Sequence, residues 1–430
     1  MGGPTRVAVV GAGLAGLAAG VALQEAGCRV ELFERSRLLG GRTTSFTVDG
    51  QEVDNGQHVF LGCCTAFQDL VARLGLAGRV RLQERFDVRV YAPGRRPSRL
   101  RAAALPAPWH LAFGFLGYAE LGWADRVRVA TTLLALSRRT GDERPLAGWL
   151  RSHGQTDAGL AAFWKPFFVP ALNAPLDRIA VGEAAFVVRT AFLADAGSAR
   201  FGFLTVPLAR LAEAAAERLE AVHLRTAVTG LERADSGSVT ALCTADGRRL
   251  AFDAFVVAVP PDRLDRLAGD LGLPPLSGFA SRPIVDVHLW HDRGTLGFDF
   301  AALLRSPVQW VFEKAPGYLC CSLSDAREVV EWPEDRLVDL GWSAVSGRVP
   351  QLAGASLVRG AATRSPDATY TAPAGVRRPG AATPARNVAL AGAWTDTGWP
   401  DTMESAVRSG RAAAERLLVR RPARQEVGVA

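Results

Sequence analysis

The sequence is nearly devoid of lysine and has few features of a nucleic-acid-binding protein. Only Lys165 and Lys314 are lysines among its 50 basic residues. The formal net charge of +7 would suit anionic partners such as lipid headgroups or nucleic acid. No basic run is interleaved with aromatic residues, so we expect no nucleic-acid partner. A GC-rich genome, which writes arginine for lysine, is the simplest explanation of the imbalance.

Metal-binding and secretion motifs are also lacking. None of the six cysteines has C-x-x-C spacing, which argues against a zinc site or a redox dithiol. His288 and His291 do not suggest a metal either, because residues three apart on a strand point to opposite faces. The apolar stretch 7–23 has no strongly basic leader, and no stretch resembles a spanning helix. We expect no metal, reduced thiols and a cytoplasmic protein.

The hydrophobic pattern predicts an α/β protein. A length of 430 residues suggests two or three domains, or one domain with an insertion. Residues 6–10 and 30–34 look like buried strands flanking a helix at 17–26, and residues 283–345 alternate like an antiparallel sheet. Further helices are expected at 65–76, within 100–203, from Pro260-Pro261 onward, at 206–221 and at 402–420, and further strands at 222–228, 239–244, 252–259 and 388–392.

A glycine-rich turn follows the first predicted strand. Gly11, Gly13 and Gly16 form G-x-G-x-x-G at the start of a helix, where backbone amides can hold a pyrophosphate. We expect Leu14 and Ala15 of this turn to join the site. Glu34 ends the second strand, where a carboxylate accepts hydrogen bonds from a ribose 2′-OH and repels a 2′-phosphate. This acid favours FAD or NAD over NADP, and we expect Arg35 beside it to contact the cofactor as well.

Two further segments favour FAD over NAD. Gly40-Gly41-Arg42-Thr43 is a second glycine turn, whose arginine can grip a pyrophosphate with a bidentate guanidinium. Residues 390–410 read as strand, glycine loop and helix, with Asp401 as the expected N-cap. A helix start aimed at the flavin pyrimidine would stabilise negative charge on the reduced ring. A nicotinamide cofactor needs no such element.

These motifs, together with Asp253-Ala-Phe-Val-Val-Ala-Val-Pro-Pro261, resemble the flavin amine oxidase and phytoene desaturase superfamily. The resemblance implies a Rossmann-type FAD-binding domain with an inserted mixed α+β substrate domain. It places the discontinuous FAD-binding domain at 1–100, 200–270 and 380–421, the substrate domain at 101–199 and 271–379, and a frayed tail at 422–430. It also implies that the backbone of Val228 contacts adenine and that Thr402 and Met403 lie beside the flavin.

A finer resemblance is to the squalene-associated FAD-dependent desaturases, which are hydroxysqualene dehydroxylases of hopanoid synthesis. It rests on five segments: Asp54-Asn-Gly-Gln-His58, Leu172-Asn-Ala-Pro-Leu176, Pro283-Ile-Val-Asp-Val-His-Leu-Trp290, Ser306-Pro-Val-Gln-Trp-Val-Phe312 and Thr395-Asp-Thr-Gly398. The resemblance implies that Gly56, Gln57, His58, Gly392 and Ala393 also belong to the cofactor site.

The chain departs from the family pattern at three positions. Leu38 stands where the superfamily often has arginine. Ala393 replaces an aspartate expected to help hold the ribityl or phosphate part of FAD, which would weaken binding. Ser405 replaces a glycine. In addition, the position near Asp286 carries lysine in amine oxidases, so its absence here argues against amine oxidation with oxygen.

The implied reaction is reductive: an allylic C30 alcohol loses water and gains a hydride from reduced FAD. An acid would protonate the leaving hydroxyl, and a dry site with aromatic faces would protect the allylic cation. Asp54, His58 and Asp396 are candidates for the acid, although each has an alternative role in holding loops or FAD.

The implied C30 isoprenoid substrate resides in the bilayer, so we expect transient contact with the inner membrane face and with squalene-pathway prenyl synthases. Residues 108–118 are apolar and carry interfacial aromatics. This segment can enter the headgroup region or, equally, line the core of the substrate domain.

Three other functions remain open at this point. The first is a carotenoid-type desaturase, which runs the flavin in the oxidative direction. The second is an amine or porphyrinogen oxidase that uses oxygen. The third is a flavin-binding protein without turnover, which the alanine at position 393 would favour.

Overall fold

The computed structural model describes residues 4–268, 271–273, 276, 278–372 and 376–419, so the predicted tail at 422–430 lies outside the described residues. A five-stranded parallel sheet forms the first half of the molecule. Its order is β10 (Ala221–His223), β2 (Arg29–Phe33), β1 (Arg6–Val10), β14 (Ala254–Val257) and β20 (Val388–Leu390). The central strands are apolar on both sides because both faces of the sheet are covered.

Helices cover one face of this parallel sheet, and a small sheet covers the other. The helices are α1 (Leu14–Glu25), α2 (Thr65–Arg73), α9 (Ala209–Ala216) and α12 (Met403–Leu418). The opposite face packs on α10 (Pro261–Ala268) and on an antiparallel sheet of β11 (Val228–Arg233), β12 (Val239–Thr244) and β13 (Arg249–Ala251). The result is a three-layer unit built from segments far apart in the sequence.

The last helix packs directly on the first. A Cβ atom added to Gly410 of α12 would lie 2.3 Å from the carbonyl oxygen of Ala15 in α1, so the two backbones touch. The N-cap of α12 is Thr402, whose hydroxyl accepts the amide of Ser405 at 3.3 Å. The expectation that Asp401 caps this helix is therefore wrong, because its carboxylate is used elsewhere.

A seven-stranded mixed sheet forms the second half. Its order is β19 (Leu357–Thr371), β15 (Ala280–His291), β18 (Tyr318–Ser324), β17 (Trp310–Ala315), β16 (Phe300–Leu303), β7 (Asp87–Tyr91) and β8 (Ser98–Arg101). All neighbours pair antiparallel except β16 and β7. Strand β7 precedes residue 100 and β8 spans it, and both belong to this sheet. The domain boundaries expected from the sequence stay a prediction.

The two faces of the large sheet have different covers. Helix α11 (Glu334–Ser346) packs on one face against valine and leucine side chains. The other face, here called the front face, carries aromatic residues that pack against a helical region. That region comprises α3 (Trp109–Leu116), α4 (Trp123–Ser137), α5 (Leu146–Ser152), α6 (Asp157–Gly159), α7 (Lys165–Leu172) and α8 (Val181–Val187).

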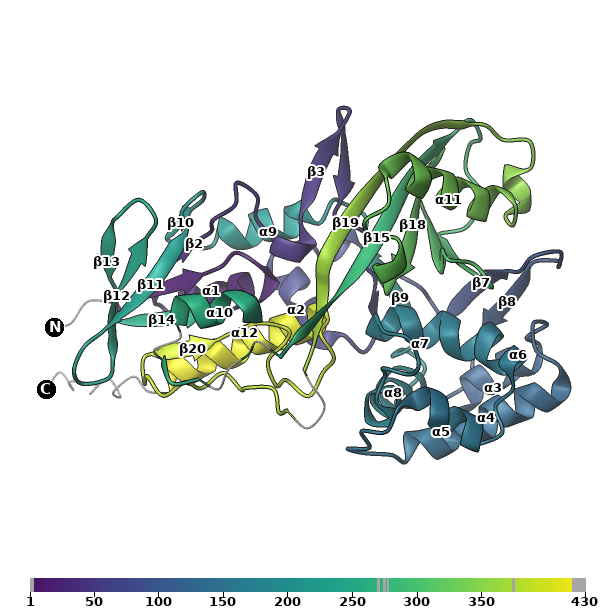
Figure 1. Cartoon of the computed structure of the whole chain (residues 1–430), viewed down its shortest axis with the longest axis horizontal. Helices are drawn as coiled ribbons and strands as arrows, with labels where there is room; N and C mark the ends of the chain where they lie inside the picture. The colour runs from purple at the N-terminus through teal and green to yellow at the C-terminus, as the bar shows by residue number, and fades with distance from the viewer. Residues whose placement is uncertain (1–3, 269–270, 274–275, 277, 373–375, 420–430) are drawn as a thin grey trace, which may run out of the picture.

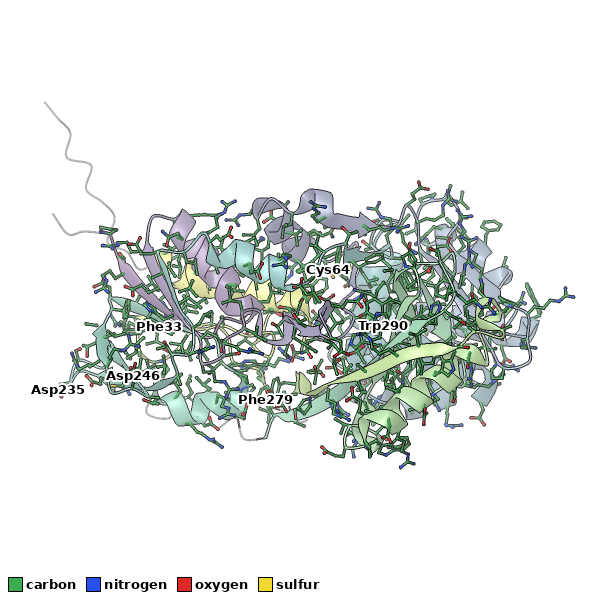
Figure 2. The ribbon with its side chains drawn as sticks, turned by 90° about the horizontal axis from the view of Figure 1, so that it is seen from above. Phe33, Cys64, Asp235, Asp246, Phe279 and Trp290 are labelled. Carbon is green, nitrogen blue, oxygen red and sulfur yellow. The ribbon has the colours of Figure 1, made fainter. Side chains whose placement is uncertain are left out.

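The two halves lie at opposite ends of an elongated molecule (Figure 1). Both termini are at the end with the parallel sheet, whereas α3 to α6 lie at the other end. Seen from above, Phe33 of β2 and Trp290 of β15 lie in different halves (Figure 2). Short pairs connect the halves: β3 (Ser45–Val48) with β4 (Gln51–Asp54), and β5 (Phe60–Leu61) and β6 (Val80–Leu82) with β9 (Phe201–Leu204).

Two expectations about secondary structure were wrong in detail. The run 222–228 is not one strand, because residues 221–223 join the parallel sheet and β11 begins only at Val228 in another sheet. The region 283–345 is antiparallel only in part, since α11 occupies residues 334–346. Tertiary packing decided both cases, because a short apolar run fits a strand or a buried helix equally well.

We predict that Gly410→Val destabilises the protein by about 1–3 kcal/mol or more, because the added atoms overlap the backbone of α1. Ala412→Val is the matched control, since it places the same residue on the exposed side of the same helix. Thermal and urea unfolding of both variants measure the difference. Equal stability of the two variants would show that the helix contact is not tight.

Candidate functional site

Two of the three glycines in the first glycine turn are tightly packed, and the third borders open space. Gly11 has φ +104°, and a Cβ on Gly16 would lie 2.0 Å from the carbonyl oxygen of Gly11. A Cβ on Gly13 would meet no atom within 4 Å. The amides at the start of α1, which begins at Leu14, have no acceptor within their own helix. A pyrophosphate can therefore approach the open position at Gly13 and receive these amides, with Ala15 in the same turn.

Glu34, which follows β2, is held beside the first glycine turn. Its carboxylate oxygens accept the amides of Ala12 and Ser36, both at 2.8 Å, and the side chain is half-buried. Each carboxylate oxygen has two lone pairs, so the group can still accept a ribose hydroxyl. Arg35 is exposed beside it. The amide of Thr226 bonds the carbonyl of Glu34 at 2.8 Å, which brings the start of β11 at Val228 alongside.

The second glycine turn contacts the first. The amide of Gly40 donates to the carbonyl of Ala12 at 2.9 Å, and a Cβ on Gly41 would lie 3.1 Å from the Cα of Gly13. Both Gly40 and Gly41 have positive φ, and the hydroxyl of Thr43 bonds the carbonyl of Gly40 at 2.8 Å. The sequence motifs thus form one continuous cradle.

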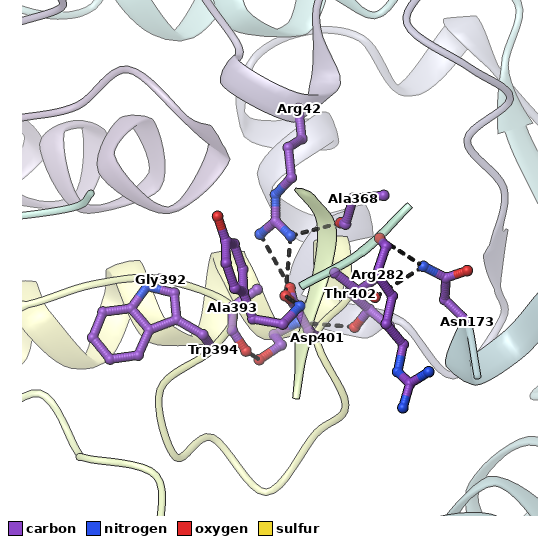
Figure 3. A network of polar contacts seen from close by, with 12 residues as sticks. Arg42, Asn173, Arg282, Ala368, Gly392, Ala393, Trp394, Asp401 and Thr402 are labelled. Carbon is purple, nitrogen blue, oxygen red and sulfur yellow. Dashed lines mark hydrogen bonds and ion pairs between the residues drawn. The ribbon is translucent and has the colours of Figure 1, made fainter. Parts of the chain in front are cut away.

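Arg42 joins this cradle to the start of the last helix (Figure 3). Its guanidinium donates to the two carboxylate oxygens of Asp401 at 3.0 and 3.1 Å, and to the carbonyl of Ala368 at 2.7 Å. The amide of Tyr370 also donates to Asp401, at 2.7 Å. The expected pyrophosphate grip by Arg42 stays a prediction, and its guanidinium is engaged by a carboxylate in this structure.

The two positions that depart from the family pattern near the C-terminus touch each other. The hydroxyl of Ser405 donates to the carbonyl of Ala393 at 2.9 Å. Gly392 donates its amide to the hydroxyl of Ser409 at 2.9 Å, and Met403 opens α12. The serine therefore fixes the loop at the place where the family's aspartate is missing. This contact could not be foreseen from either substitution alone.

Asp286 is a buried acid on the front face of the large sheet. Burial raises the pKa of this carboxyl to about 6, against the opposing effect of Ser322, the amide of Gln57 and Lys314. Gly56 has φ +89°, and a Cβ there would lie 2.4 Å from a carboxylate oxygen of Asp286. The loop that carries Gly56 and Gln57 thus rests on the acid, and joins the cofactor half to the large sheet.

Lys314 approaches the same loop from β17. The pairing of β17 with β18 is irregular between Glu313 and Ala315, so Lys314 lies at a bulge. Its ammonium lies 3.3 Å from Asp54 and 2.8 Å from the side-chain oxygen of Gln57. Sequence reasoning did not select this residue. The available signal was its rarity, as one of two lysines in the chain.

The three acid candidates from the sequence have different surroundings. Asp54 is buried and accepts the Ser45 hydroxyl at 2.7 Å and the Leu208 amide at 2.9 Å, besides Lys314. His58 lies next to it, and burial lowers its pKa. Asp396 is exposed and accepts only an amide of its own loop, from Gly398, among the contacts described. Asp54 and His58 thus flank the loop segment whose Gln57 amide donates to Asp286 at 3.4 Å, and the described contacts of Asp396 stay within its own loop.

An aromatic wall continues the front face beyond the acid. Asp286 pairs with Ser322, which in turn pairs with Trp310, so these three side chains share a face. By the same register, Phe312 and Phe300 lie on this face farther along. One polar patch therefore borders a row of buried aromatic side chains, which belong to the core that packs against the helical region.

His288 lies on the same face, beside Cys320. Its Nδ1 is 2.8 Å from the hydroxyl of Tyr318, and burial lowers its pKa to about 4. The imidazole is therefore neutral near pH 7. It can orient the hydroxyl of the tyrosine, but it carries no positive charge to the patch.

The comparison with known proteins decides the class. The family of flavin-containing amine oxidoreductases matches residues 14–418. The chain belongs to this family. A hydroxysqualene dehydroxylase of Rhodopseudomonas palustris is 30% identical to this oxidoreductase over 96% of the chain and 98% of the relative. A 15-cis-phytoene desaturase of Solanum lycopersicum is 25% identical over 96% of the chain and 78% of the relative.

The fold is also found among solved structures. An oxidoreductase from Methanosarcina mazei has a TM-score of 0.74 at 16% identity, over 95% of this chain and all of that one. The protein is thus an FAD-dependent oxidoreductase with an amine oxidase-like fold, as the sequence predicted. Two features fit this cofactor: the open position at Gly13, and the carboxylate of Glu34, which can accept further hydrogen bonds. The individual residues predicted to contact FAD stay predictions.

We predict that two alanine substitutions in the first glycine turn affect different properties, FAD binding in one case and stability in the other. Gly13→Ala leaves the stability of the apoprotein within about 0.5 kcal/mol, because φ is −69° and the added methyl meets no protein atom. It weakens FAD binding about tenfold or more, since the methyl occupies the phosphate position. Gly16→Ala instead destabilises the apoprotein, because its Cβ overlaps Gly11.

Apoprotein melting and titration with FAD, followed by flavin fluorescence, separate the two effects. Unchanged FAD affinity in Gly13→Ala would contradict the placement of the phosphate.

Proposed function

We propose that this oxidoreductase converts hydroxysqualene to squalene by reductive dehydroxylation. The observation that supports it most directly is the front face, where one buried carboxyl borders an aromatic wall beside the cofactor loop. The relative from Rhodopseudomonas palustris, which bears the name of this activity, adds support across nearly the full length of both chains.

The proposed reaction balances without oxygen. The allylic C–O bond breaks, the hydroxyl leaves as water with a proton from an acid, and the carbon gains a hydride. FAD, when bound and reduced, supplies that hydride and both electrons. The protein's own contribution is to hold the alcohol, donate the proton and keep water away from the cationic carbon.

Asp286 is the residue to which we assign the proton donor. Its pKa of about 6 leaves roughly a tenth of the carboxyl groups protonated at pH 7, far more than for an ordinary carboxyl. Asp54 is less suited, because its oxygens are engaged by Ser45, Leu208 and Lys314. The Asp286 carboxyl also lies against Gly56, so it faces the loop that the family resemblance places near the flavin.

The aromatic wall serves the cation that forms when water leaves. The ring faces of Trp310, Phe312 and Phe300 can stabilise a positive charge, whereas basic side chains in their place would repel it. Phe167 packs against Trp310 from α7, at 6.1 Å between ring centroids. Together these rings keep the surroundings dry, so that water does not recapture the carbon.

A carotenoid-type desaturation is the second candidate, supported by the similarity to the tomato phytoene desaturase. Oxidative removal of hydrogen needs no acid to expel a leaving group. The buried carboxyl therefore favours dehydroxylation.

We also infer that prenyl synthases of the squalene pathway deliver the substrate.

The deciding experiment is an anaerobic incubation of the purified flavoprotein with hydroxysqualene and a reductant, followed by product analysis. Squalene is the expected product. In parallel, phytoene is offered with an electron acceptor, and amines are offered in air with detection of hydrogen peroxide. Conversion of phytoene or release of peroxide, without squalene, would refute the proposal. Flavin binding without any product would leave a binding protein.

We predict that Asp286→Asn lowers kcat/KM about a hundred- to ten-thousand-fold, because the amide cannot donate a proton of comparable acidity. In the wild type, kcat/KM should fall about tenfold per pH unit above about pH 6, as the carboxyl loses its proton. The residual activity of Asp286→Asn should lack this decline. Asp396→Asn is the matched control, and an equal loss there would contradict the assignment.

We predict that Lys314→Met shifts the decline of the pH profile to higher pH. The ammonium lowers the pKa of Asp286, so its removal raises that pKa and extends the protonated range. Lys314→Arg retains the charge and should restore the original profile more closely. A profile that stays at its original pH in Lys314→Met would show that the lysine does not influence the acid.

A further inference from the structure

Large apolar side chains are exposed mainly on one part of the surface. Of the eleven that are exposed among the described residues, seven lie between positions 105 and 134. Trp109, Phe113 and Trp123 are 60%, 58% and 66% exposed. The full set, here called the outer apolar face, is Leu105, Trp109, Phe113, Leu116, Trp123, Val127 and Leu134. Scattered exposed apolar residues are ordinary, but such a concentration of them marks an interaction surface.

The spacing of these residues places them on the outer sides of two helices. Trp109, Phe113 and Leu116 follow one another at intervals of four and three along α3. Trp123, Val127 and Leu134 do the same along α4, at intervals of four and seven. The inner sides of the two helices carry another set of buried residues, namely His110, Phe115, Val129, Thr132 and Leu136. The outer residues are therefore not needed for the core.

The two helices form one surface. The side chain of Arg126 in α4 donates to the carbonyl of Leu121 at 2.9 Å and also to that of Leu116, the last residue of α3. This arginine satisfies carbonyls at the end of α3 and fixes the turn between the helices. Figure 1 places α3 and α4 at the end of the molecule remote from the parallel sheet.

The segment that carries this face is rich in arginine, and part of that charge is paired: Arg99 and Arg101 both bind Asp87, which lies outside the segment. Residues 93–140 contain eight arginines and two acidic residues, a net charge of +6 out of +7 for the whole chain. Arg96 and Arg138 are exposed and take part in none of the ion pairs that the structure describes. Arginine next to exposed tryptophan and phenylalanine is the composition of a surface that binds anionic headgroups and inserts rings between them.

We propose that the outer apolar face and its arginines dock on an anionic lipid bilayer, with α3 and α4 lying in the plane of the headgroups. No helix of the described part of the chain is long and apolar enough to cross a membrane, so contact is at the surface. A protein partner is the alternative occupant of this face, and the experiment below distinguishes it from a bilayer. The inference goes beyond the proposed reaction and does not require turnover.

The docking face and the front face share one apolar core. Phe115 of α3 packs on Phe163 at 5.3 Å between ring centroids, and Phe163 packs on Phe167 at the same distance. Phe167 then contacts Trp310 of the aromatic wall at 6.1 Å. A bilayer at α3 would thus lie on the apolar side of the site, away from the parallel sheet. A substrate dissolved in lipid would approach from that side. The half that carries the parallel sheet would remain in water.

The test is flotation of the full-length holoprotein with vesicles of phosphatidylcholine alone and of phosphatidylcholine with phosphatidylglycerol. Binding to the anionic vesicles is expected, with weakening at high salt. The triple variant Trp109→Ser, Phe113→Ser, Trp123→Ser should bind about tenfold more weakly or worse, since a tenfold loss requires only about 1.4 kcal/mol. Leu224→Ser, Val358→Ser, Val376→Ser is the matched control, because its exposed apolar residues lie elsewhere.

A second variant and a second readout make the result independent of folding. Arg96→Gln, Arg138→Gln should lose part of the preference for anionic vesicles while retaining the apolar face. In the wild type, brominated acyl chains should quench tryptophan fluorescence, because Trp109 and Trp123 enter the lipid. Flavin content and turnover of substrate dissolved in detergent are measured separately, so failure of docking and failure of the proposed reaction are distinguishable.

Three results would overturn the docking proposal. The first is equal flotation of the triple variant and its matched control. The second is the absence of both flotation and quenching in the wild type. The third is a wild-type dimer that the triple variant converts to monomers without any vesicle binding, which would assign the face to a second copy of the chain.

Discussion

The backbones of α1 and α12 touch at Gly410, and the cofactor site depends on this contact. It holds the last helix so that its start reaches the second glycine turn, where Arg42 and Asp401 form a bidentate ion pair. Segments from the two ends of the chain thereby surround one nucleotide site. The carboxylate of Asp401 is only 4% exposed in this pair. The bidentate contact fixes the relative position of the two segments, whether or not it adds to the stability of the fold. The same contact explains why a glycine, rather than a better helix former, is found within α12.

The front face carries a second constraint, which is the cost of burying ionisable groups. Asp286 has no lysine or arginine within hydrogen-bonding distance among the described contacts, so burial keeps its carboxyl closer to neutral than usual. Asp54, by contrast, is paired with Lys314 and anchored by a hydroxyl and an amide. Two carboxyl groups on one loop junction thus differ in environment and can differ in role. The family fold fits many reactions, and it is this difference that distinguishes the present site.

Most of the exposed large apolar side chains among the described residues lie in the half that carries α3 and α4. The parallel sheet and its helices form the half that binds the nucleotide, whereas the aromatic wall and α3 to α8 form the other. Both the proposed substrate and the proposed bilayer contact belong to the second half. The charge is distributed in the same sense, since the arginine excess lies in the segment that precedes and includes α3 and α4. The proposed apolar substrate and the charged cofactor are thus assigned to different halves of the molecule.

The sequence alone determined the first strand, the glycine turn and the acid at Glu34, because they are local: each depends on neighbours within one βαβ unit. It also determined the FAD cofactor and the fold, through motifs at both ends of the chain. The acid Asp286 and its neighbour Lys314 were decided only by the tertiary structure. Strand register and a bulge bring them to the same loop from positions far apart in the chain. The N-cap of α12 was likewise settled by competition, since Arg42 takes the carboxylate of Asp401 and leaves the cap to Thr402. Such choices depend on which distant partner arrives, and no local pattern records that.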